Sequence, residues 1–119
     1  MMLDWNGYRQ QVQDMVAELG RSTLGTVRGY RELSNAGAAK DLLGAKTREL
    51  IALAVAVTRQ CDGCITIHMD AALKHGATRD EIAEALGVAI AVNAGAALVY
   101  STRALDAYAA TAAESGAPP

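Results

Sequence analysis

The chain is short, half apolar and weakly acidic, with 119 residues, 51% of them hydrophobic, and a net charge of −2 at pH 7. This length predicts a single domain over residues 1–119. Lys and Arg are scattered, which argues against binding to nucleic acid or to an anionic membrane. The longest apolar run, Leu50 to Val57, is far shorter than the roughly 20 residues of a membrane span. The N-terminus lacks a signal-peptide pattern, so we expect a soluble, cytoplasmic protein.

Alanine supplies much of the apolar fraction, whereas the chain has no Phe, one Trp and four Tyr. Side chains of this size predict thin, closely packed helices with few bulky contacts. A small domain with such a core gains further burial when copies of it associate. We therefore expect a homo-oligomer.

The first forty residues predict two helices. One apolar face recurs at steps of three and four. Its members are Trp5, Tyr8, Val12, Met15 and Leu19. Gly20 is the predicted stop of this helix. Leu24 to Leu33 predicts a second, weaker helix, and the fading pattern from Ser34 to Gly44 predicts a loop.

The strongest helical segment is Thr47 to Arg59, whose interior is apolar on every side. Such a helix is expected to be buried at the centre of the fold. Asp62 and Gly63 can redirect the chain into a further helix that runs to about His75. Gly76 then closes this helix as a left-handed cap.

The C-terminal region predicts two more helices. Thr78 to Glu81 has the capping-box pattern that opens a helix. The positions expected to be buried behind it are Ile82, Ala85, Leu86 and Ala89. Gly95 is a predicted break before a last helix. That helix carries Leu98, Leu105 and Tyr108. Because no segment alternates as a strand does, the predicted fold class is all-α, a compact bundle of five to six helices.

Two cysteines, Cys61 and Cys64, lie where one predicted helix ends and the next begins. Two intervening residues allow a disulfide with little distortion of the backbone. The free amides at a helix N-terminus stabilise a thiolate, which can attack a disulfide or a peroxide. The second cysteine can then resolve the product. In a cytoplasmic chain this spacing favours redox or metal chemistry over a structural disulfide.

His68 and Glu49 extend this candidate site. His68 follows Cys64 by four residues, so the two side chains share one face of a helix. An imidazole there can take the thiol proton or hold the thiolate. If the two helices pair antiparallel, Glu49 and His68 are offset by about 8 Å along the helix axes, which two side chains or one water could span. This orders a proton relay as Glu49, His68, Cys64 and Cys61.

Each of these residues also has a simpler interpretation. Glu49 taken alone fits an acidic residue that is favoured in a first helical turn. His68 taken alone fits a surface or core residue, and the cysteines could be inert packing. Cys61, Cys64 and His68 could also be three zinc ligands, but the sequence offers no convincing fourth, since His75 lies almost two turns further along.

Taken together, these residues resemble a known family. Glu49, Cys61, Cys64 and His68 at these spacings resemble the signature of the alkylhydroperoxidase D-like branch of the carboxymuconolactone decarboxylase family. The flanking segments are also similar, and the resemblance covers residues 40–106. These segments are Lys46 to Ala52, Ala71 to Thr78, Glu81 to Leu86 and Ala97 to Tyr100. One difference is Gly63, because the best-known members carry a histidine between the two cysteines.

The resemblance implies an all-helical fold that forms trimers or hexamers. It also implies a thiol-dependent peroxidase or disulfide oxidoreductase with Cys61 and Cys64 as the cycling pair and His68 and Glu49 as the relay. The expected substrate is a hydroperoxide or a disulfide, and the reductant is a thiol protein or a lipoyl-type dithiol, with no cofactor and no metal. The alternative from another class is a non-catalytic helical oligomer or binding module.

Overall fold

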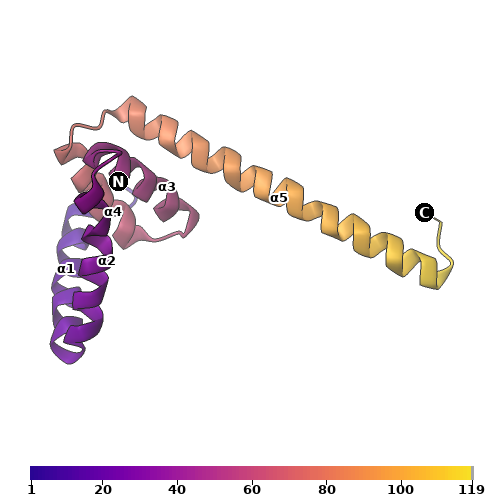
Figure 1. Ribbon diagram of the computed structural model, residues 1–119, viewed down its shortest axis with the longest axis horizontal. Helices are drawn as coiled ribbons and strands as arrows, with labels where there is room; N and C mark the ends of the chain where they lie inside the picture. The colour runs from indigo at the N-terminus through magenta and orange to yellow at the C-terminus, as the bar shows by residue number, and fades with distance from the viewer. Residues whose placement is uncertain (119) are drawn as a thin grey trace.

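The computed structural model describes residues 1–118, and these residues form helices and no strands. The five helices are α1 (Trp5–Ser22), α2 (Leu24–Lys40), α3 (Ala45–Thr58), α4 (Asp62–Lys74) and α5 (Arg79–Ser115). Figure 1 shows α1 and α2 side by side, α3 and α4 next to them, and α5 leading away. The predicted all-α class is confirmed.

Helices α1 and α2 form a hairpin, and Gly20 lies at their contact. Gly20 is buried within α1, and a Cβ placed on it would lie 3.6 Å from Cγ1 of Val27 on α2. The helix was predicted to stop at Gly20 but runs on to Ser22, and Gly20 instead allows close approach of the two helices. Thr23, between the two helices, donates its backbone N–H to Leu19 and so caps α1.

Helix α2 continues to Lys40, where a loop from Ser34 to Gly44 was expected. A tertiary contact accounts for the extension. The side chain of Arg48 on α3 lies against Gly37, and its Nη1 pairs with Asp41 Oδ1 at 2.7 Å. Asp41 adopts a left-handed conformation (φ 48°) and ends the helix. The weak local pattern of this segment is thus overridden by packing.

The core lies between α3, α4 and the first turns of α5. Its buried members are Leu53, Ala72, Ala77 and Ile82, and Leu50, Met69 and Leu86 pack against them. Helix α3 was expected to be buried on every side, and this is wrong for the single chain. Leu53 is 1% exposed, whereas Ile51 is 49% exposed and Val55 is 55% exposed. Within residues 1–118, one apolar face of α3 is therefore left uncovered.

The predicted signals at the junction of α4 and α5 are confirmed. Gly76 has φ +83° after the last turn of α4, as a left-handed cap requires. Thr78 Oγ1 accepts the N–H of Glu81 at 3.1 Å, and Glu81 Oε2 accepts the N–H of Thr78 at 2.9 Å. Lys46 at the start of α3 donates to Glu81 at 2.9 Å. The starts of α3 and α5 are thereby held together.

Helix α5 is one continuous helix, so the break predicted at Gly95 is wrong. Strong helix formers on both sides of Gly95 keep the helix intact despite its weak propensity. Asn93 hydrogen-bonds to Thr58 at the end of α3 at 2.7 Å, and beyond this point α5 projects from the other helices (Figure 1). The radius of gyration is 20.4 Å, against roughly 13 Å for a compact chain of this length. Helices α1 to α4 and the part of α5 up to Asn93 therefore form the packed body of the molecule.

The distal part of α5 exposes large apolar side chains on several sides of the helix. They are Leu98, Val99, Tyr100, Leu105 and Tyr108, each more than half exposed. By length and composition alone, α5 is also the one helix among the described residues that could cross a membrane. The sequence did not reveal one long apolar stretch in α5, because small alanines and glycines interrupt its large residues.

Candidate redox site

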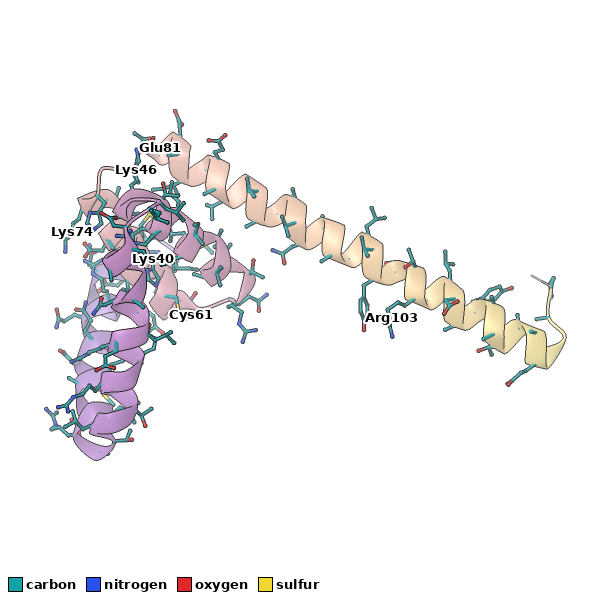
Figure 2. The ribbon with its side chains drawn as sticks, viewed as in Figure 1. Lys40, Lys46, Cys61, Lys74, Glu81 and Arg103 are labelled. Atoms are coloured by element: carbon teal, nitrogen blue, oxygen red, sulfur yellow. A yellow bond between two sulfur atoms is a disulfide. The ribbon has the colours of Figure 1, made fainter. Side chains whose placement is uncertain are left out.

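A disulfide joins Cys61 and Cys64 at the start of α4 (Figure 2 marks Cys61), with their Cα atoms 5.2 Å apart. The chain between α3 and α4 turns through Gln60, which has a positive φ of 52°, and Cys61, which is extended. Cys61 is the N-cap of α4, and its Sγ accepts the N–H of Cys64 at 3.2 Å. The sulfur of Cys61 therefore lies against a free amide of a helix start, where a negative charge is stabilised.

His68 and Glu49 form a direct pair. Glu49 Oε2 lies 2.7 Å from His68 Nδ1, and the side chains are 22% and 26% exposed. Of the two bridges expected between these residues, two side chains or one water, the structure shows the direct contact of the two side chains. A carboxylate only accepts hydrogen bonds, so Nδ1 donates and Nε2 remains free to exchange a proton.

An apolar cavity of about 600 Å³ connects the disulfide and His68 to solvent. It lies between α1, α2 and α4, and Cys61, Cys64 and His68 line it while Glu49 lies behind His68. Its size is typical of ligand sites, which span roughly 300–1,000 Å³. Within residues 1–118, His68 makes no hydrogen bond to either sulfur in this disulfide form. Three of the four predicted residues thus line the cavity, and the fourth, Glu49, contacts His68 from behind.

The walls that α1 and α2 give to this cavity were missed by the sequence reasoning. They include Val12 and Val16 from α1 and Tyr30 and Arg31 from α2. The spacing of Val12 and Val16 marks an apolar helix face, but nothing local indicates that this face lies opposite the cysteines. That proximity depends on how α1 packs on α4, where Thr66 donates to the carbonyl of Trp5 at 2.9 Å.

Gly63 lies between the two cysteines and lines the same cavity. A Cβ placed on it would lie 3.5 Å from Cγ1 of Val12, an ordinary contact. A small side chain therefore fits at this position, while an imidazole would extend into the cavity. Gly63 leaves space next to the disulfide.

The described residues contain no group of three or more His, Cys, Asp and Glu side chains placed to hold a metal. His75, weighed as a fourth zinc ligand, is the exposed C-cap of α4, at the end of that helix opposite to the cysteines. The geometry of the cysteines is that of a disulfide pair.

Three relatives of known sequence are similar over much of their length. An uncharacterized protein of Haemophilus influenzae is 48% identical over 91% of this chain and 96% of its own. An uncharacterized protein of Cupriavidus necator is 32% identical over 80% of this chain and 84% of its own. Uncharacterized protein 4 in the cox locus of Paracoccus denitrificans is 41% identical over 64% of this chain and 68% of its own.

A solved structure and a family model agree on one family. The crystal structure of an apo carboxymuconolactone decarboxylase family protein from Legionella pneumophila superposes with a TM-score of 0.71 and 34% identity, over 87% of this chain and 93% of that one. The model of the carboxymuconolactone decarboxylase family matches residues 25–107. The alkylhydroperoxidase D-like branch, which the C-x-x-C pair resembles, lies within this family. The chain belongs to the carboxymuconolactone decarboxylase family.

Proposed function

We propose that this protein is a thiol-dependent peroxidase or disulfide oxidoreductase of the alkylhydroperoxidase type. The observation that carries the proposal is the Cys61–Cys64 disulfide in an apolar cavity that His68 also lines, with Glu49 hydrogen-bonded behind the imidazole. A dithiol pair, a base and an orienting carboxylate are the parts needed for thiolate chemistry.

The reaction has two bond-forming steps. One thiolate attacks a peroxide oxygen, the O–O bond breaks, and the products are an alcohol and a cysteine sulfenic acid. The second thiol then attacks the sulfenic sulfur, releasing water and forming the disulfide. An external dithiol, either a thiol protein or a lipoyl-type group, takes the oxidising equivalents and restores both thiols. Nε2 of His68 accepts the thiol proton and returns it to the leaving alkoxide.

The cytoplasm is the compartment that suits this cycle. Its glutathione and thioredoxin systems keep thiols reduced, so a dithiol is regenerated there between turnovers. This role is antioxidant: the protein consumes hydroperoxide and draws on the thiol pool.

We also propose that copies of the chain associate as a trimer or hexamer. The distal part of α5 and the uncovered face of α3 expose apolar residues such as Leu98, Leu105, Ile51 and Val55. Single exposed apolar residues are ordinary, but many of them on one projecting helix mark an interaction surface. A second copy that exposes the same residues is a matching partner.

The test of the peroxidase proposal is a thiol count. Reduced protein treated with one equivalent of tert-butyl hydroperoxide should lose both alkylatable thiols, lose two hydrogens in mass and release one equivalent of alcohol. Dithiothreitol should restore the thiols. The Cys61→Ser and Cys64→Ser variants are the controls, since the one that keeps the attacking thiol traps a sulfenic acid. Two alkylatable cysteines after peroxide, or stoichiometric zinc in the purified protein, would contradict the proposal.

A further inference from the structure

The cavity beside the disulfide has a mostly apolar lining that includes one guanidinium group. Val12, Val16 and Ile67 contribute apolar wall, and Arg31 lies among the lining residues with the hydroxyl-bearing Tyr30 and Ser34. No Asp or Glu of the described residues lines it. A cavity of this kind suits a ligand with an apolar body and few polar groups.

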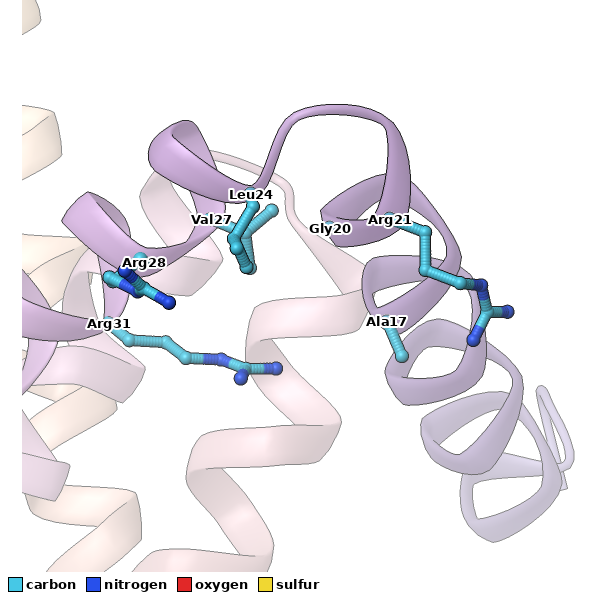
Figure 3. A pocket seen from close by; sticks show the side chains of 7 residues that line it. All are labelled: Ala17, Gly20, Arg21, Leu24, Val27, Arg28 and Arg31. Atoms are coloured by element: carbon cyan, nitrogen blue, oxygen red, sulfur yellow. The ribbon is translucent and has the colours of Figure 1, made fainter.

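Arg31 also lines a neighbouring cleft between α1 and α2. Val27 and Arg31 are common to both hollows, and the second also contains Arg28 and Arg21 (Figure 3). Arg21 pairs with Glu18 at 2.6 Å, whereas Arg28 and Arg31 make no ion pair within residues 1–118. Arg31, which lines both hollows, and Arg28 in the cleft therefore carry positive charges that no carboxylate of residues 1–118 pairs with.

The cysteines and Arg31 belong to different elements of this cavity. Cys61, Cys64 and His68 come from the start of α4, and Arg31 comes from α2. Glu49 is already engaged by His68 at 2.7 Å and does not reach Arg31 as an ion pair. The cavity thus offers a redox centre, an apolar wall and a guanidinium to one bound molecule.

Resting on the proposed function, we propose that the preferred oxidant is an amphipathic carboxylic acid that carries a hydroperoxide, of the class of oxidised fatty acids. Its chain lies along the apolar wall, its carboxylate binds Arg31, and its O–O group lies at the cysteines. The guanidinium is suited to a carboxylate because it donates two parallel hydrogen bonds. The hydroperoxide is reduced to the hydroxy acid and water while the dithiol becomes the disulfide.

Recognition is tested on the disulfide form, which does not react. Decanoate and the neutral decanol have the same chain, and calorimetry measures their affinities separately. Wild type should bind decanoate about 5- to 10-fold more tightly than decanol, and Arg31→Met should remove that preference. Lys40→Met is the matched control, since Lys40 is an exposed cation on the same helix that lines neither hollow. Equal binding of the two probes by wild type, or an unchanged preference in Arg31→Met, overturns the inference.

Turnover separates this inference from the proposed function. ω-Hydroperoxydecanoic acid should oxidise the reduced protein with a kcat/KM about 5- to 10-fold above that of its methyl ester, and Arg31→Met should equalise them. If neither compound oxidises the cysteines, the peroxidase function fails, while decanoate binding still decides whether Arg31 recognises a carboxylate. If both are consumed equally by wild type, the function stands and the inference fails. Absence of any decanoate binding, as when a second copy fills the cavity, also overturns it.

Discussion

Glu49 and His68 lie on adjacent helices with Oε2 and Nδ1 2.7 Å apart, although nineteen positions separate them in the chain. The carboxylate orients the imidazole and balances its charge when Nε2 takes a proton. This pair is the part of the proposed relay that is in direct contact, while the step from His68 to Cys64 needs the thiol state or a bound substrate.

The first prediction concerns this pair as a unit. His68→Ala should slow oxidation of the cysteines by roughly 100- to 10,000-fold. Adding Glu49→Gln should cost little more, because groups that act together give non-additive losses. Stopped-flow rates with a hydroperoxide measure this, and circular dichroism checks that the fold persists. In both variants, alkylation of Cys64 should also require a higher pH than in wild type.

The control for the relay is Glu84→Gln, an exposed carboxylate on α5. It should leave both the rate and the pH profile unchanged. A Glu49→Gln protein with wild-type rate and profile would leave Glu49 as a helix-start residue that merely packs beside His68.

The second prediction concerns the space beside the disulfide. Gly63→His should lower the rate with a bulky hydroperoxide more than the rate with hydrogen peroxide, because the imidazole takes cavity volume. Gly63→Ala is the control: its Cβ would make only an ordinary contact with Val12. It should leave the ratio of the two rates unchanged and stabilise α4 by up to about 1 kcal/mol. Equal loss with both peroxides in Gly63→His would mean that the imidazole does not act by excluding the larger substrate from the cavity.

The third prediction concerns assembly through α5. Leu98→Asp with Leu105→Asp should convert the oligomer to a monomer, since each buried leucine contributes about 1.5–3 kcal/mol. Both residues are distant from the core around Leu53, so the monomer should remain folded. Light scattering measures the mass. A wild-type monomer at micromolar concentration, or co-flotation of wild type with lipid vesicles, would point away from self-association.

The fourth prediction concerns pH and the junction of α3 and α5. The N–H of Thr78 and the ammonium of Lys46 lower the pKa of Glu81 below its ordinary 4.5. A lowered pKa in the folded state stabilises the protein above pH 4.5, and this contribution is lost as the pH falls through the folded-state pKa. Urea unfolding should therefore find Glu81→Gln less stable than wild type at neutral pH, with the difference closing in acid.

The control for the junction is Asp80→Asn. Asp80 is an acid in the same helical turn, but Lys46 donates its hydrogen bond to Glu81 and not to Asp80. Its stability difference from wild type should be smaller and should depend less on pH. If Glu81→Gln and Asp80→Asn behave alike, the helix dipole rather than the specific hydrogen bonds of Glu81 accounts for the effect.

The sequence predicted features that depend on local chemistry. The capping box at Thr78, the left-handed Gly76 and the position of the cysteines at a helix start each follow from a few adjacent residues, and all three are confirmed. The closeness of His68 and Glu49 could be predicted because the two residues lie on consecutive helices that pair antiparallel. The roles assigned to these residues stay predictions.

Features that depend on distant contacts were beyond the sequence. Helix α2 extends to Lys40 because Arg48 from another helix packs against Gly37 and pairs with Asp41. Gly20 suggested a helix end, but α1 runs on to Ser22, and only the tertiary structure shows that Gly20 packs against Val27 of α2. Arg31 carries no motif, and its place beside the cysteines is set by the packing of three helices.

The uninterrupted course of α5 separates two uses of the molecular surface. Its first turns pack on α3, and its distal part carries exposed apolar side chains far from the cavity, which residues of α1, α2, α4 and the N-cap Cys61 line. The projecting helix extends about 30 Å beyond Asn93. Subunits that join through this helix would contact one another far from each redox centre. Assembly and substrate entry would then use different parts of the surface.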